Sequence, residues 1–147
     1  MKIACIIPSR YASTRLPGKP LRMIARETLV HRVYERAVLA KLPDIVIVAT
    51  DNEKIESEVK SFGGRVMMTS PDHPTGTDRL AEVAASLPDY DIVVNVQGDE
   101  PFINPDVIDS LAKMLAERDD LDMTTAAAPL KEDEYDDPSA VKVVVNQ

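Results

Sequence analysis

The sequence predicts an α/β fold built on an open, mostly parallel sheet. Short, almost wholly apolar runs rich in β-branched residues alternate with longer segments whose apolar residues recur every three or four positions. Strands that are covered on both faces of a parallel sheet have the first pattern, and the helices that connect them have the second. Because 147 residues suffice for about one domain, we assign residues 1–147 to a single α/β domain.

Three buried strands are expected, at residues 2–8 (KIACIIP), 44–50 (DIVIVAT) and 91–96 (DIVVNV). Each is short and bounded by polar residues or proline. A further β-branched run, AVKVVV at residues 140–145, predicts another strand near the end of the sequence.

Four helices are expected around these strands. The first runs from about Thr28 to Lys41, and the second follows a cap at Asp51 or Asn52 and ends at the glycines 63–64. The third spans about 77–86, and the fourth follows residues 104–105, where a proline suits the first turn. Apolar residues at helical spacing predict the buried faces: Leu29, Val30, Val33, Tyr34, Ala37 and Val38, then Ile55, Val59 and Phe62, then Leu80, Val83 and Ala84, and finally Val107, Ile108, Leu111, Met114 and Leu115.

Charge and composition exclude several classes of protein. A net charge of −8 argues against a general nucleic-acid binder, because affinity for a phosphate backbone needs a cationic surface. The charge is uneven, however: residues 1–42 hold nine Lys and Arg against two acidic residues, which suits a small polyanion. No apolar run approaches the roughly 20 residues that span a bilayer, and the start is unlike a signal peptide, so we expect a cytoplasmic protein without a membrane partner. Cys5, the only cysteine, is expected to be a small buried hydrophobe.

The chemically distinctive residues follow the predicted strands, where open α/β sheets bind their ligands. PSRYASTRLPGK follows the first strand, Thr50–Asp51 follow the second, and QGDEP at 97–101 follows the third. The first of these segments combines three cations and a glycine with small hydroxyl side chains: Arg10, Arg15, Lys19, Gly18, and the hydroxyls of Ser9, Ser13 and Thr14. Such a set suits a triphosphate, whose charge must be neutralised and whose oxygens accept many hydrogen bonds.

Two common nucleotide-binding motifs are excluded. None of the five glycines forms G-x-G-x-x-G, so the dinucleotide fingerprint is absent. A Walker loop that ended at Lys19 would need glycine at position 13 and a hydroxyl residue at position 20, where the sequence has Ser13 and Pro20.

Four segments, in this order, resemble the 3-deoxy-manno-octulosonate cytidylyltransferase (CMP-Kdo synthetase) family: IPSRYASTRLPGKPL, VATDNEKI, HPTGTDRLAEV and VNVQGDEPFI. YASTRLPGKP is much closer to this family than to the related sialic-acid cytidylyltransferases. The resemblance implies a Rossmann-like sheet of the nucleotide-diphospho-sugar transferase type. One departure is ARETL at residues 25–29, where the family usually has Gly-Lys-Pro; we expect it to set the entry to the first helix.

The resemblance covers nearly all of this chain but only the N-terminal portion of the family's usual length, so the sequence looks truncated. By resemblance, the missing part supplies most of the sugar site, a second acidic metal ligand and the contacts of a homodimer. Two functions therefore stay open: a cytidylyltransferase, or a non-catalytic CTP-binding fragment without the sugar half. Within the first, 8-amino-Kdo is an alternative acceptor to Kdo.

The implied reaction is CTP plus Kdo giving CMP-Kdo and pyrophosphate, the activation step before Kdo enters lipopolysaccharide. Chemistry of this kind depends on positioning and charge stabilisation, so cations and Mg²⁺ should carry it. The resemblance implies that Arg10, Arg15 and Lys19 hold the β- and γ-phosphates, with backbone amides around Ser13 and Gly18 as further donors. It makes Asp99 the Mg²⁺ ligand, although the residues alone equally allow a turn residue. Arg10, Lys19 and Asp99 are thus the expected catalytic residues.

Other segments are expected to complete the nucleotide site. By resemblance, TGTDR lines the base and ribose; its members are Thr75, Gly76, Thr77, Asp78 and Arg79. The same segment can cap a helix, with its aspartate complementing the helix dipole, and both roles are compatible. Gln97 can donate and accept at once, as recognition of a base edge or a sugar hydroxyl requires. Two roles remain possible for Glu100: a salt bridge, or a place on the sugar side of the site. His31 and His73 lack metal-ligand partners at suitable spacing and are expected to be structural or solvent-facing.

Overall fold

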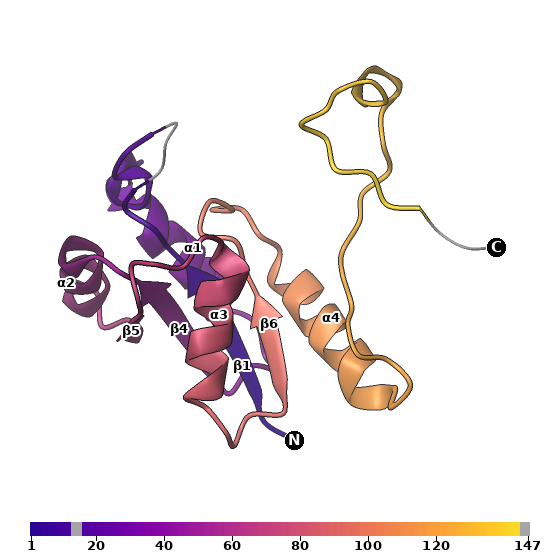
Figure 1. The fold of residues 1–147 in the computed structure, drawn as a ribbon, viewed down its shortest axis with the longest axis horizontal. Coiled ribbons are helices and arrows are strands. Elements are labelled where there is room, and N and C mark those ends of the chain that lie inside the picture. Colours follow the sequence, from indigo (N-terminus) through magenta and orange to yellow (C-terminus); the bar gives the residue numbers. More distant parts are fainter. Residues whose placement is uncertain (13–15, 145–147) are drawn as a thin grey trace.

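The structure, a computed structural model, describes residues 1–12 and 16–144 and has the predicted α/β architecture (Figure 1). A parallel sheet of four strands has the order β5-β4-β1-β6. The strands of this sheet are β1 (Ile3–Pro8), β4 (Ile45–Thr50), β5 (Val66–Met68) and β6 (Ile92–Asn95). The helices that pack on it are α1 (Leu29–Ala37), α2 (Glu53–Ser61), α3 (Gly76–Ala85) and α4 (Pro105–Glu117). Short elements complete the list: η1 (Lys19–Leu21), the hairpin strands β2 (Met23–Ile24) and β3 (Glu27–Thr28), and η2 (Glu132–Glu134).

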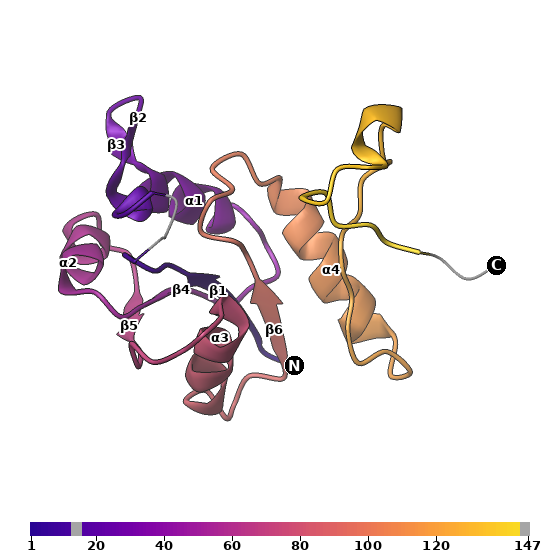
Figure 2. The ribbon, with the colours of Figure 1, turned by 45° about the horizontal axis from the view of Figure 1, so that its top comes forward.

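The helices cover both faces of the sheet, which explains why its strands are apolar throughout. Alternate residues of β1 point to opposite faces: Cys5 and Ile7 pack with α1, α2 and α4, whereas Ile6 packs with Val83 of α3. Figures 1 and 2 show α3 on one side of the sheet and α1 on the other. Every residue of β1 is buried, and burial raises the pKa of the Cys5 thiol to about 12, as expected for a cysteine that acts as a hydrophobe.

The predicted strands at 2–8, 44–50 and 91–96 are confirmed as β1, β4 and β6 within two residues at each end. The strand predicted at 140–145 is wrong over its described part, because residues 140–144 form no strand. A strand needs a neighbour for its backbone N–H and C=O groups. The segment after α4 instead runs away from the sheet (Figure 1), and Val141 and Val144 are each 90% exposed.

The four predicted helices are confirmed, with corrections at their ends and faces. The first stops at Ala37 rather than Lys41, because the chain turns there and the backbone N–H groups of Lys41 and Leu42 donate to the Asp109 carboxylate of α4. Asn52, not Asp51, caps α2. Two residues predicted to face inward do not: Val38 is 47% exposed and Met114 is 49% exposed.

The ARETL segment contains the turn of the β2–β3 hairpin, at residues 25–26, then strand β3 and the first residue of α1. Ala25 and Arg26 have φ values of 47° and 79°, the positive pair that a two-residue hairpin turn requires. The hydroxyl of Thr28, the last hairpin residue, accepts from the His31 N–H and caps α1. The segment therefore sets the entry to the helix, as predicted. None of the helices in the described part of the chain has the length and apolar character needed to span a membrane.

Candidate functional site

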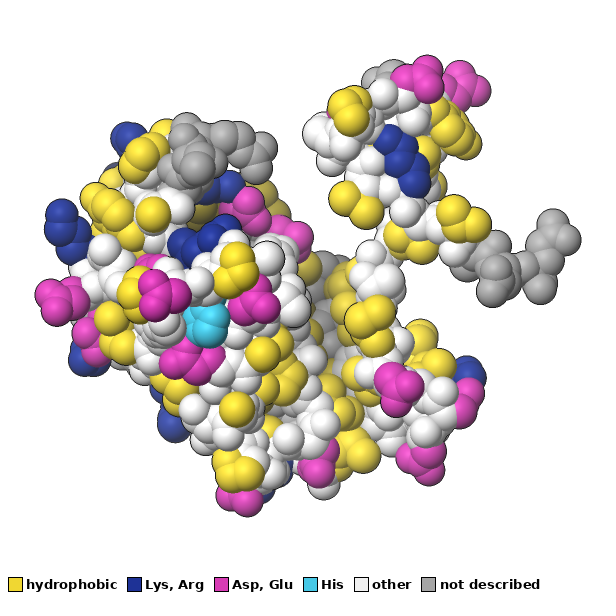
Figure 3. Space-filling model, viewed as in Figure 1, with side chains coloured by type: hydrophobic (Ala, Val, Ile, Leu, Met, Phe, Trp, Pro, Cys, Tyr) yellow, Lys and Arg dark blue, Asp and Glu magenta, His cyan; other side chains and the backbone are white. Residues whose placement is uncertain are grey.

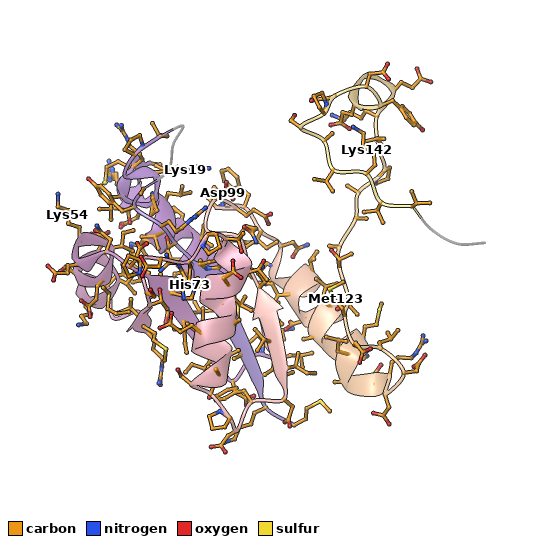
Figure 4. The ribbon with its side chains drawn as sticks, in the orientation of Figure 1. Lys19, Lys54, His73, Asp99, Met123 and Lys142 are labelled. Atoms are coloured by element: carbon orange, nitrogen blue, oxygen red, sulfur yellow. The ribbon has the colours of Figure 1, made fainter. Side chains whose placement is uncertain are left out.

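Three segments that lie far apart in the sequence meet at the carboxyl ends of β1 and β6. The Lys19 side chain points toward Asp99 (Figure 4), and its Nζ donates to Asp99 Oδ2 at 2.6 Å. Arg10 Nη1 donates to the Pro74 carbonyl at 2.9 Å. The loop after β1 thus contacts both the segment before α3 and the loop after β6. Ser13 and Arg15, also predicted here, lie outside the described residues.

Local backbone geometry positions Lys19. Gly18 has a φ of 68°, a left-handed conformation that favours glycine, and it directly precedes η1. Its N–H donates to the Tyr11 carbonyl at 2.9 Å, and its carbonyl accepts from Leu21 N–H at 2.9 Å. The loop is therefore closed on itself through Gly18. The Gly18 amide, expected to be a donor to ligand, is engaged within the protein.

Gly98 positions Asp99, and it is a site residue that sequence reasoning missed. A Cβ at this position would lie 2.6 Å from the Pro8 carbonyl oxygen, so only glycine allows the loop after β6 to cross so closely over the end of β1. A turn follows, in which Glu100 N–H donates to the Gln97 carbonyl at 3.2 Å. The available signal was a glycine directly before a carboxylate at a strand's carboxyl end. The Gln97 side chain is exposed and donates to Asn95 at 3.2 Å.

The predicted TGTDR segment forms the amino terminus of α3. Thr75 and Asp78 make a capping box, in which the threonine hydroxyl accepts from Asp78 N–H at 3.2 Å and the carboxylate accepts from Thr75 N–H at 3.1 Å. The hydrogen bond from the Thr75 hydroxyl lowers the pKa of Asp78. The capping role is thus confirmed, and Thr75, Thr77 and Asp78 remain exposed beside the Arg10 contact.

Arg79, predicted to touch nucleotide, is instead fully buried beneath the site. Its guanidinium donates to Asp51 Oδ2 at 2.7 Å and to the Thr69 hydroxyl. These bonds tie α3 to the carboxyl end of β4 and to the residue after β5. A buried ion pair of this kind fixes position, because loss of one partner leaves an uncompensated charge. The contacts of Arg79 favour a role in holding α3 over a direct contact with ligand.

The two histidines have structural partners, as predicted. His73 pairs with Glu82, and this hydrogen bond lowers the pKa of the glutamate. His31 stacks on Phe62 with ring centroids 4.0 Å apart. Within the described ranges, no group of three or more His, Cys, Asp or Glu side chains is placed to hold a metal ion. The carboxylate of Asp99 is an oxygen ligand of the kind that hard cations such as Mg²⁺ prefer.

Cationic and acidic side chains lie side by side near the carboxyl ends of the strands (Figure 3).

A family model described as cytidylyltransferase matches residues 4–147. The chain belongs to the cytidylyltransferase family. Two curated relatives, both named 3-deoxy-manno-octulosonate cytidylyltransferase, come from Syntrophotalea carbinolica and Geotalea daltonii and are 50% and 54% identical to this chain. The matches cover 100% and 99% of this chain but only 59% and 58% of the relatives.

A solved structure of CMP-2-keto-3-deoxy-manno-octonic acid synthetase in complex with CTP is similar in fold, with a TM-score of 0.80 and 43% sequence identity. The match covers 82% of this chain and 50% of that one. It confirms the predicted Rossmann-like sheet of the nucleotidyltransferase type. This cytidylyltransferase chain spans about three fifths of the length of the curated relatives, consistent with their N-terminal portion.

Proposed function

We propose that this chain carries the nucleotide site of an enzyme that transfers CMP from CTP to Kdo, releasing pyrophosphate, for lipopolysaccharide synthesis. The observation that carries the proposal is the Lys19–Asp99 ion pair, which joins the loop after β1 to the loop after β6, while Arg10 of the same first loop contacts the segment before α3. Cations beside one accessible carboxylate suit a metal-bound triphosphate. A structure 43% identical to this chain is described as a complex with CTP, which supports the choice of nucleotide.

Lys19 and Arg10 would bind the β- and γ-phosphates by exchanging their protein acceptors for phosphate oxygens. Arg15 belongs to the same set by sequence. In the reaction, an oxygen–phosphorus bond forms between the anomeric hydroxyl of the sugar and the α-phosphorus, and the bond to pyrophosphate breaks. The hydroxyl proton passes to solvent, and pyrophosphate leaves with the electron pair. The two cations offset the charge that grows on this leaving group.

The proposed cofactor is Mg²⁺, and Asp99 is the residue of this chain that would hold it. Bound there, the ion would neutralise phosphate charge. Gly98 keeps the carboxylate at the end of β6, where it faces Lys19. The capped amino terminus of α3, from Thr75 to Asp78, would face the nucleoside, with Gln97 as a further donor and acceptor.

The location, the oligomeric state and the acceptor are proposed from the similarity to 3-deoxy-manno-octulosonate cytidylyltransferases. We place the enzyme in the cytoplasm, as a homodimer, with Kdo rather than 8-amino-Kdo as acceptor. A second candidate is CTP binding without transfer, which the same contacts of Lys19 and Arg10 would allow.

Pyrophosphate release, measured with CTP, Mg²⁺ and Kdo, tests the proposal. Release that requires both CTP and Kdo is expected, with little release when ATP, GTP or UTP replaces CTP. Calorimetry run in parallel separates the second candidate, which predicts CTP binding without release. Comparable affinity for all four nucleotides would contradict a cytidylyltransferase. Faster release with 8-amino-Kdo than with Kdo would reassign the acceptor.

A further inference from the structure

We propose that the Lys19–Asp99 ion pair makes the site select a complex of divalent cation and triphosphate over either component alone. The identity of the two ligands rests on the proposed function. The new element is the order of affinities: triphosphate without metal and metal without triphosphate should both bind poorly, for a reason that lies in this chain's own residues.

The ammonium of Lys19 and the carboxylate of Asp99 already bind one another. Nζ of Lys19 and Oδ2 of Asp99 lie 2.6 Å apart, although the residues are 80 positions apart in the sequence. Their side chains are 39% and 52% exposed, so ligands can reach both. Among the described residues, neither side chain has any other hydrogen bond or ion pair. Taking one member of the pair therefore leaves the other without a partner.

Each ligand alone meets a penalty. A triphosphate binds Lys19 only by displacing Asp99, and the freed carboxylate then lies near phosphate oxygens of the same sign. A cation captures Asp99 only by leaving the ammonium of Lys19 unpaired and close to a second positive charge. When both ligands arrive, the lysine exchanges carboxylate for phosphate and the aspartate exchanges ammonium for metal. Because linkage is reciprocal, each ligand raises the affinity for the other by the same factor.

Arg10 provides an internal contrast. Its guanidinium donates to the Pro74 carbonyl, a neutral acceptor, at 2.9 Å. Arg10 can turn to a phosphate without releasing a negative charge into the site. The coupling between metal and triphosphate is therefore assigned to the pair Lys19–Asp99, and loss of Arg10 should weaken triphosphate binding with and without metal.

Calorimetric titration with inorganic tripolyphosphate and with CTP, each in EDTA and in saturating Mg²⁺, tests the proposal. In EDTA, Asp99→Asn should bind tripolyphosphate about threefold to tenfold more tightly than the wild type, because the amide neither holds Lys19 as an ion pair nor repels phosphate. In Mg²⁺ the order should reverse. The enhancement by Mg²⁺, expected to be about fivefold or more in the wild type, should nearly vanish in the variant.

Glu100→Gln is the matched control. It removes the same charge one residue away, from a side chain that forms no ion pair within the described part of the chain. We expect a change of less than about twofold in both conditions, and no reversal. Asp99→Ala is a second carboxylate-free variant should the first fail to fold, and circular dichroism checks the fold of each.

The outcomes separate this inference from the proposed function. Asp99→Asn that binds tripolyphosphate in EDTA no more tightly than the wild type would overturn the partner exchange, even if CTP is preferred over other nucleotides. A reversal with tripolyphosphate, together with equal affinity for CTP and ATP, would support the exchange and overturn the assignment of cytidine.

Discussion

Residues 1–117 and residues 118–144 show how differently two parts of one chain can be stabilised. The first part contains every buried side chain among the described residues, and its helices cover both faces of a parallel sheet. The second leaves α4, forms only the short η2, and exposes Met123, Tyr135 and Val144 at 80%, 64% and 90%. Apolar burial is the main stabilising term in folding. All described residues of the candidate site belong to the first part, so the site is built on the well-packed sheet.

The largest expected difference between the two parts is in thiol reactivity. Cys5 is fully buried with its pKa raised to about 12, so at pH 8 it should react with a disulfide reagent only when the sheet opens. A cysteine introduced at Val141, in a Cys5→Ala background, should react at least about a thousandfold faster, because local opening there requires almost no free energy. Stopped-flow absorbance measures both rates. Rates within tenfold of each other would mean that the sheet is no better protected than the C-terminal segment.

Breaking an ion pair should lower the stability more in residues 1–117 than in residues 118–144. Asp51→Ala leaves the guanidinium of Arg79 buried and unpaired, which should lower the free energy of unfolding by about 3–5 kcal/mol. Asp120→Ala breaks the exposed Arg118–Asp120 pair and should change it by less than about 1 kcal/mol. Urea denaturation measures both. The double variant Asp51→Ala/Arg79→Met should recover part of the loss, and equal effects of the two single variants would contradict the comparison.

Two glycines that approach the same proline should differ in their response to a methyl group. Gly98→Ala places a Cβ 2.6 Å from the Pro8 carbonyl oxygen and should reduce stability by about 1–3 kcal/mol. Gly76→Ala places a Cβ at 3.5 Å from the Pro8 ring, an ordinary contact within a helix, and should be neutral or slightly stabilising. Thermal unfolding of both variants checks this. A neutral Gly98→Ala would remove the reason given for the position of Asp99.

The smallest expected effect is on acid stability. The hydrogen bond with His73 lowers the pKa of Glu82 below its ordinary value of 4.5 in the folded state. The ionised carboxylate therefore stabilises the fold at pH values above the pKa of the unfolded state. Its contribution is lost as the pH falls from about 4.5 through the lowered pKa. Glu82→Gln should therefore show a shallower loss of urea midpoint between pH 6 and 3 than the wild type.

Asp137 is the control for that prediction. The hydroxyl of Ser139 lowers its pKa too, but within a local turn of the C-terminal segment. Asp137→Asn should leave the acid dependence of global unfolding unchanged. An equal flattening in both variants would mean that the segment unfolds together with the sheet.

The sequence predicted the elements whose patterns come from burial. β1, β4, β6 and the four helices have strong apolar patterns, because they pack in the clusters on the two faces of one sheet. β5 and the β2–β3 hairpin have only two or three residues each, too few for a period to be recognised. The run at 140–145 shows the opposite failure: β-branched composition favours a strand, but only pairing with a neighbour forms one.

The site was predicted in part. The order of polar segments after strands predicted that the loop after β1 meets the loop after β6, and the Lys19–Asp99 contact confirms that meeting. What could not be predicted depends on three-dimensional contacts. The burial of Arg79 against Asp51, and the close approach of Gly98 to Pro8, require knowledge of which strands are neighbours.

Titration of CTP and CMP into Lys19→Ala by calorimetry tests most directly that the loop after β1 binds the outer phosphates. The variant should lose about tenfold or more in affinity for CTP, equivalent to about 1.5–3 kcal/mol, and almost none for CMP, which lacks those phosphates. Lys2→Ala, the same change at the amino end of β1, should alter neither affinity. Equal losses for CTP and CMP in Lys19→Ala would contradict the assignment of this loop to the triphosphate.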